Sequence, residues 1–101
     1  MVNQIYENSN GFPESEKFGL ITQIRRCTVS IPSNIADGCG RGTNKDFNYF
    51  LSVSLGSSFE LETQLILAHD LGFLDSRNLS PLLEQVHEIQ KMIIGLQSVM
   101  K

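Results

Sequence analysis

The chain has 101 residues, a length that suits one domain built around a single hydrophobic core. Its hydrophobic content of 41% and charged content of 19% are ordinary for a globular protein, which excludes the disordered and fibrous classes. The formal charge of -3 gives no overall basic field, so non-specific attraction to nucleic acid is not expected from the total charge.

The sequence offers no membrane or export signal. No apolar run approaches the roughly 20 residues that a spanning helix needs, and the first residues lack the basic and apolar regions of a signal peptide. We therefore expect a cytoplasmic protein with no membrane partner. Cys27 and Cys39 fall on one predicted helix, roughly 18 Å apart at about 1.5 Å of rise per residue, which is too far for a disulfide. Free thiols suit a reducing compartment.

Clusters of glycine and proline divide the chain into helical segments. The predicted helices span about residues 1–8, 14–38, 44–70 and 76–100. The first has barely two turns, whereas the other three would each be roughly 35 to 42 Å long. The sequence therefore predicts an all-α fold, an up-down antiparallel four-helix bundle in a single domain, residues 1–101, with a short or truncated first helix. Some apolar surface at one end should then be exposed or covered by another subunit.

The predicted second helix has an apolar face that a proline interrupts. Pro32 removes one backbone hydrogen bond and leaves the carbonyl of Thr28 without its usual partner, so a kink is expected. The residues expected to be buried are Phe18, Ile21, Ile24, Thr28, Ile31 and Ile35.

The predicted third helix opens with a capping-box-like arrangement from Thr43 to Asp46. Its buried seam is expected at Phe47, Leu51, Ser54, Ser58, Leu61, Leu65 and Ala68. A second apolar stripe lies on another face, at Leu55, Phe59, Ile66 and Phe73. A helix that is apolar on more than one side is buried or oligomeric. We therefore predict that this second stripe is an oligomer face.

The predicted fourth helix has the clearest pattern, and Asp75 or Ser80 can cap its start. Its seam alternates spacings of three and four through Leu79, Leu82, Val86, Ile89, Ile93, Leu96 and Met100. Glu84 and His87 have the Glu-x-x-His spacing of di-iron bundles, but a core position for Val86 turns both of them outward. We therefore predict no metal site.

Catalytic machinery is not visible in the sequence. The two histidines lie on different segments, and no serine or cysteine stands in a recognisable nucleophile motif. No pair of carboxylates is obviously buried together. We therefore predict a protein that is not an enzyme, with no catalytic residue, no cofactor and no small-molecule substrate.

A polar stripe on the predicted second helix has polar counterparts on the third. We interpret it as a structural network of hydrogen bonds and ion pairs that involves Arg26, Ser30, Asn34, Asp37, Glu60, Glu62 and Gln64. The functional alternative is nucleic-acid or anion contact by Arg25, Arg26, Arg41 and Lys45. The glycine-rich turn at residues 38–42 precedes a helix start that favours anions, although a plain helix-to-helix turn is the favoured interpretation.

Several unusual strings in this chain occur in the order and at the separations of a known family. They are FPESEKFGL at 12–20, QIRR at 23–26, SIPSNIADG at 30–38, LGSSFELETQL at 55–65 and LGFL at 71–74. Over about residues 5–100 the chain resembles the bacterial four-helix-bundle family first noticed in intervening sequences of 23S ribosomal RNA genes. The ribosomal label of that family reflects gene location.

The resemblance implies an up-down four-helix bundle, a ring-like homo-oligomer that is commonly a pentamer, and no established enzymatic activity. A distantly similar bundle protein that assists diversity-generating reverse transcription contacts nucleic acid, which extends the implied partners to RNA or DNA. The chain departs from the family at Asp37, where glutamate is usual. In the family, two or three further helical turns usually precede the Ile5–Tyr6 region. The given sequence is therefore either a fragment, a chain whose start was assigned too late in the gene, or a natural short form.

Together these observations predict a non-enzymatic, self-assembling helical bundle that acts as a binding or scaffold protein. The alternative is an RNA- or DNA-binding homo-oligomer, linked to ribosomal RNA intervening sequences or to an accessory role in reverse transcription.

Overall fold

The computed structural model describes residues 1–9 and 17–100 of the chain. Its elements in chain order are α1 (Val2–Ser9), a π-helical turn η2 (Lys17–Ile21), α2 (Thr22–Cys39), α3 (Asn44–Asp70) and α4 (Ser76–Ser98). No strand occurs within these two ranges. The prediction of an all-α fold with a short first helix is therefore confirmed. The predicted start of the second helix at residue 14 lies outside the described residues.

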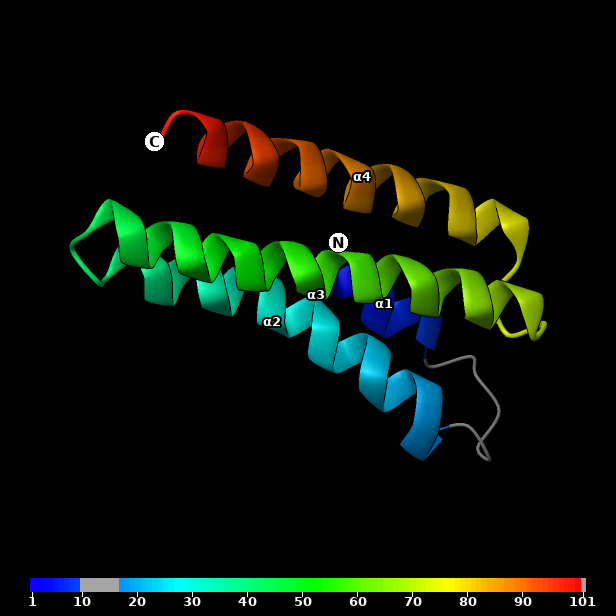
Figure 1. Cartoon of the computed structure of the whole chain (residues 1–101). Helices are drawn as coiled ribbons and strands as arrows, with labels where there is room; N and C mark the ends of the chain where they lie inside the picture. Colours follow the sequence, from blue (N-terminus) through cyan, green and yellow to red (C-terminus); the bar gives the residue numbers. More distant parts are fainter. Residues whose placement is uncertain (10–16, 101) are drawn as a thin grey trace.

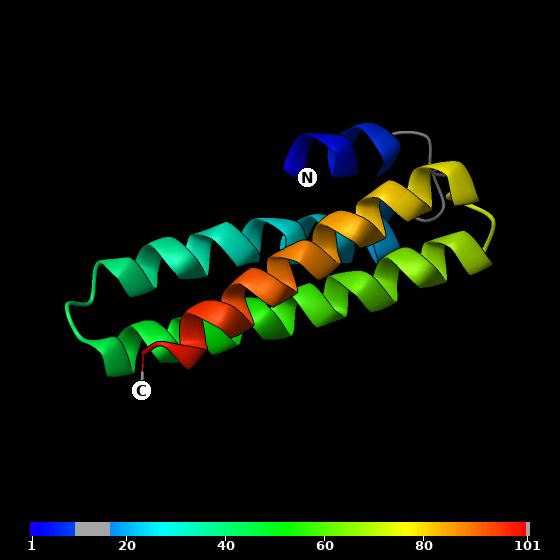
Figure 2. The ribbon, with the colours of Figure 1, turned by 90° about the horizontal axis from the view of Figure 1, so that it is seen from above.

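The long helix α3 lies at the centre of the molecule, with α2 packed on one side and α4 on the other (Figure 1). Both neighbours run antiparallel to α3, so α2 and α4 are parallel to each other. The short helix α1 contacts α2 and α4 and covers only the half of this three-helix layer that is nearest the α3–α4 turn (Figure 2). Among residues 1–9 and 17–100, no helix covers the other half of the α2–α4 side.

The seams predicted from helical periodicity form the core. Every predicted seam residue of α3 from Leu51 to Ala68 is buried, and Ile24 and Thr28 of α2 face them. Side-chain caps begin two of the helices as expected. The backbone N–H of Asp46 donates to Thr43 Oγ1 over 3.2 Å at the start of α3, and that of Asn78 donates to Asp75 Oδ1 over 2.9 Å at the start of α4.

Gly38 permits a close approach between α2 and α3. A Cβ atom at this position would lie 2.9 Å from both Phe47 Cδ1 and Phe50 Cβ, closer than packed carbon atoms normally come. The side chain of Arg41, just beyond, lies over the Phe50 ring with its guanidinium carbon 4.9 Å from the ring centroid. The small residue and the stacked cation together fix the α2–α3 end of the layer.

The predicted interruption at Pro32 lies inside α2, which continues through it to Cys39. Polar side chains donate to carbonyls near the proline: Asn34 Nδ2 to Ser30 O and Ser54 Oγ to Ile31 O, both over 2.9 Å. The second of these bonds joins α3 to α2 within the buried interior. The buried serine of the seam therefore ties α3 to the backbone of α2 beside Pro32.

Candidate assembly surface

The second apolar stripe of α3 lies partly open to solvent. Phe59 is 50% exposed and Ile66 is 39% exposed, while Leu55 and Phe73 are half-buried. Helical spacing puts Leu55, Phe59 and Ile66 on the side of α3 that borders α4, away from the buried seam. Phe73 does not continue the stripe on the helix, as the sequence suggested, because α3 ends at Asp70 and Phe73 lies in the α3–α4 turn. Among them, Phe59 is the largest side chain that the fold leaves uncovered. The structure thus leaves the predicted oligomer face accessible at its two central residues.

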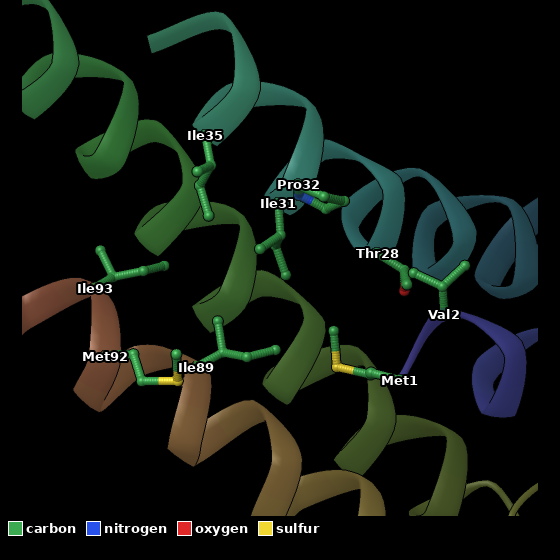
Figure 3. A pocket seen from close by; sticks show the side chains of 9 residues that line it. All are labelled: Met1, Val2, Thr28, Ile31, Pro32, Ile35, Ile89, Met92 and Ile93. Carbon is green, nitrogen blue, oxygen red and sulfur yellow. The ribbon is translucent and has the colours of Figure 1, made fainter. Parts of the chain in front are cut away.

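A separate apolar groove lies between α2 and α4, on the half of the layer that α1 does not cover (Figure 3). The cavity has a volume of about 290 Å³. Figure 3 shows the side chains of both helices projecting toward the space between them, with Met1 at one end. The lining residues are Met1, Val2, Thr28, Ile31, Pro32, Ile35, Ile89, Met92 and Ile93.

The second half of α4 continues the apolar surface beyond this groove. Met92 is 67% exposed, Leu96 is 40% exposed and Val99 is 75% exposed, and these three recur at helical spacing on one side of the helix. Leu96 was expected in the buried seam, and that expectation is wrong because no helix of the described part of the chain covers the α2–α4 channel at its level. The short first helix predicts some exposed apolar surface at one end, but the sequence reasoning did not place that surface on α4. Residues 92–100 contain no charged side chain, a signal that could have located it.

The structure divides the predicted polar network between two helix pairs. Between α2 and α3, the hydroxyls of Ser30 and Ser57 lie 2.9 Å apart, and Asn34 Nδ2 donates to Ser30 Oγ over 2.9 Å. Arg26 and Asp37, on the same side of α2, are exposed to solvent. The hydroxyl group of Ser57 completes this contact, although Ser57 was not among the expected members.

Glu62 does not join α2, as the predicted network required, but contacts α4. Gln90 Nε2 donates to Glu62 Oε1 over 2.9 Å, and His87 Nε2 lies 3.3 Å from Glu62 Oε2. The reason is rotational: along α3, Glu62 follows the buried Leu61 on the α4 side of the seam, whereas Glu60 and Gln64 fall on the α2 side. The pKa of Glu62 is lower than its ordinary value, mainly because Gln90 donates a hydrogen bond to the carboxylate.

The polar residues on the α2 side of α3 surround a buried thiol. Cys27 Sγ donates to Glu60 Oε2 over 3.5 Å, and Gln64 lies beside the same thiol. Burial, and next the neighbouring Glu60 carboxylate, raise the pKa of Cys27. The thiol is therefore held in its neutral form and is a poor nucleophile. Cys39 is exposed, and both cysteines are free.

The four predicted nucleic-acid contacts fall at two separate places. Arg25 and Arg26 lie near the start of α2, and the guanidinium carbon of Arg25 stands 4.5 Å from the centroid of the Tyr6 ring in α1. Arg41 and Lys45 lie at the α2–α3 turn, both exposed. At about 1.5 Å of rise per residue, the two pairs are roughly 20 Å apart along the helix axis. The fold does not gather them into one basic patch.

The residues considered for metal chemistry point outward. Glu84 and His87 are exposed, as the position of the buried Val86 requires. Among residues 1–9 and 17–100 there is no group of three His, Cys, Asp or Glu side chains placed to hold a metal ion. Over the same part of the chain, no helix combines the length and apolar character needed to cross a membrane.

The comparisons with known proteins identify a family. No curated protein matches the chain. The family model described as 23S rRNA-intervening sequence protein matches residues 1–95, which is nearly the whole chain and includes all of α1, α2 and α3 and most of α4. The chain is therefore a member of the 23S rRNA-intervening sequence protein family.

Proposed function

We propose that this chain is a non-enzymatic, self-assembling bundle whose homo-oligomer serves as a binding or scaffold unit. The observation that carries the proposal is the exposure of Phe59 and Ile66 on a helix whose buried seam is already satisfied on another face. Aromatic and aliphatic side chains exposed together on one face are typical of protein interfaces. The number of subunits that the sequence resemblance implies, commonly five, is part of this proposal.

The assembly surface is the second apolar stripe, which consists of Leu55, Phe59 and Ile66 of α3 together with Phe73 of the α3–α4 turn. Its two central residues would be covered by a neighbouring subunit, while the half-buried outer two continue the apolar contact into the fold. The polar cluster of Glu62, His87 and Gln90 borders this stripe and would form a polar rim. Such an arrangement requires no ligand and no catalytic group.

Light scattering of the purified chain over a range of concentrations tests the proposal. We expect a defined oligomer, and we expect Phe59→Glu combined with Ile66→Glu to shift it strongly toward monomer, because two charges would be buried without partners. Leu67→Glu is the matched control, since Leu67 is 46% exposed on the same stretch of α3 but lies about 100° around the helix from Ile66. A wild-type chain that stays monomeric at high concentration would contradict the proposal.

Nucleic-acid binding is the second candidate function, and the pair of exposed basic residues at the α2–α3 turn favours it. Arg41 and Lys45 lie close to the start of α3, where backbone N–H groups and the helix dipole attract phosphate. In a ring of subunits, each copy would contribute one such pair. Binding to RNA derived from 23S sequences should weaken steeply with salt and with Arg41→Glu. Unchanged binding by that variant would contradict this assignment.

A further inference from the structure

A histidine and a glutamate lie against the second apolar stripe. Glu62 is three residues after Phe59 and four residues before Ile66, so helical spacing puts all three on one side of α3. From α4, His87 reaches the same place, with its Nε2 3.3 Å from Glu62 Oε2. The His87 side chain is 49% exposed and the Glu62 side chain 27%. A neighbouring subunit that covers Phe59 and Ile66 therefore also removes water from the pair beside them.

The net charge of this pair depends on one proton. The hydrogen bond from Gln90 lowers the pKa of Glu62 below its ordinary value of 4.5, so the carboxylate stays ionised at neutral pH. Imidazole is the side chain that ordinarily changes charge between pH 5 and pH 8. With a neutral imidazole the pair carries one unbalanced negative charge, whereas with a protonated imidazole the two charges balance. Removing water costs more free energy for the unbalanced charge than for the balanced pair.

The other charged groups near His87 leave this balance in place. On α4, Glu84 and Lys91 lie about one turn on either side of His87, are exposed, and have opposite signs. Glu88, the next residue, points about 100° further around the helix. Of the charged side chains of α3, which the structure describes in full, Glu62 is the one in contact with the imidazole. The contact with Glu62 therefore determines how the imidazole responds when water is removed.

We propose that assembly through the stripe takes up a proton at His87, so that the subunits associate more tightly as the pH falls from 8 to 6. The inference rests on the proposed function, because the pair loses water only when a second copy covers the stripe. It adds a dependence on pH that the apolar contact alone does not have, since Phe59 and Ile66 cannot titrate. The sign follows from linkage: a state that binds more protons is favoured as the pH falls.

Sedimentation velocity at pH 6, 7 and 8 and constant ionic strength tests this dependence. EDTA in every sample keeps metal ions from joining the subunits. The wild-type chain should associate at least about threefold more tightly at pH 6 than at pH 8. His87→Gln keeps an amide nitrogen near the place of Nε2 but cannot titrate, so its association should be equal at the two pH values. Equal association of the wild-type chain at pH 6 and pH 8 would overturn the inference.

Glu62→Gln tests the sign of the effect. Without the carboxylate, a protonated His87 has no opposite charge in contact with it. The dependence should then reverse, and association should weaken at least about threefold as the pH falls from 8 to 6. A Glu62→Gln chain that associates more tightly at pH 6, as the wild type should, would overturn the role of the pair.

The other histidine of the chain, His69, provides the matched control. It lies in the last turn of α3, with its Nδ1 3.4 Å from Asp70 Oδ1. The Asp70 side chain is 66% exposed, so this second pair stays solvated. His69→Gln should therefore keep the wild-type pH dependence. If His69→Gln loses the dependence and His87→Gln keeps it, the assignment to His87 is wrong.

The inference and the proposed function fail in different ways. Circular dichroism and thermal melting at each pH establish that the wild-type chain and every variant are folded. Association that is lost in Phe59→Glu/Ile66→Glu but does not change with pH would support the assembly surface and overturn the proton uptake. A wild-type chain that is monomeric at every pH would overturn both.

Discussion

Glu62 of α3 and His87 of α4 approach each other at the surface where the two helices meet, with 3.3 Å between Glu62 Oε2 and His87 Nε2. The other carboxylate oxygen of Glu62 accepts from Gln90 Nε2 over 2.9 Å, so both oxygens engage α4. Further along, His69 Nε2 and Ser76 Oγ are 2.9 Å apart. The α3–α4 pair is therefore joined by polar contacts outside its apolar seam.

The first prediction concerns the pH dependence of stability. The pKa of Glu62 is lower in the folded chain than its ordinary value of 4.5. Its contribution to the free energy of unfolding is therefore fully present above pH 4.5 and is lost as the pH falls through the lower folded value. Glu62→Gln should reduce the loss of the free energy of unfolding at low pH by less than about 1 kcal/mol, because the pair is partly exposed. Urea unfolding measured from pH 7 to pH 3 checks this.

Glu84→Gln provides the comparison for that measurement, because Glu84 is exposed on α4, the helix that carries His87 and Gln90. If both variants change the loss of stability at low pH equally, the contact between α3 and α4 does not cause that loss.

The second prediction concerns thiol reactivity. Cys27 is buried and its pKa is raised, first by burial and next by Glu60, so little thiolate forms near neutral pH. In the folded chain a thiol reagent should modify Cys39 quickly, and Cys27 only as fast as the structure opens. Mass spectrometry of the modified peptides distinguishes the two sites. In Cys39→Ser, rapid labelling of the native chain would show that Cys27 is more accessible than this structure allows.

The third prediction concerns the close approach at the α2–α3 end. Gly38→Ala places a Cβ atom 2.9 Å from Phe47 Cδ1 and Phe50 Cβ, so the helices must separate. We expect a loss of about 1–3 kcal/mol in the free energy of unfolding, the usual cost of overpacking. Gly40→Ala is the matched control, because its Cβ would lie no closer than 3.7 Å to Asp37 O and its φ of -82° suits alanine. Equal effects of the two changes would contradict the packing argument.

The fourth prediction concerns the attachment of α1. Ile5 is buried among residues of the core, whereas Val2 on the same helix is 37% exposed. Ile5→Ala should reduce the free energy of unfolding by about 2–4 kcal/mol, and Val2→Ala should change it much less. Amide hydrogen exchange adds a local measurement, since protection of α1 should fall more than that of α3. Unchanged protection in Ile5→Ala would mean that other contacts hold the helix.

Helical periodicity predicted much of the fold because it depends only on each helix taken alone. The seam of α3 from Leu51 to Ala68 is buried as expected, and Thr43 and Asp75 cap their helices as expected. A cap or seam is determined within about two turns of the same helix, so neighbouring residues in the sequence are enough to recognise it.

The placement of polar side chains depends on more than periodicity. In the sequence, Glu60, Glu62 and Gln64 were grouped as polar partners for α2. In the structure α3 lies between two helices, and Glu62 faces α4 whereas Glu60 and Gln64 face α2. The same limit applies to the basic residues. Arg25 and Arg41 were both predicted to contact nucleic acid, yet most of the length of α2 separates them.

By itself, the sequence determined the helical class, the seams and caps, and membership of the chain in its family, because these rest on local spacing and on the order of strings. Only the tertiary structure decided which apolar residues stay uncovered. Leu96 has the spacing of a core residue, but burial requires a neighbour on the other side, and α1 covers the α2–α4 channel only as far as Met1. Periodicity gives the direction of a side chain from its own helix axis and does not say whether another helix lies in that direction.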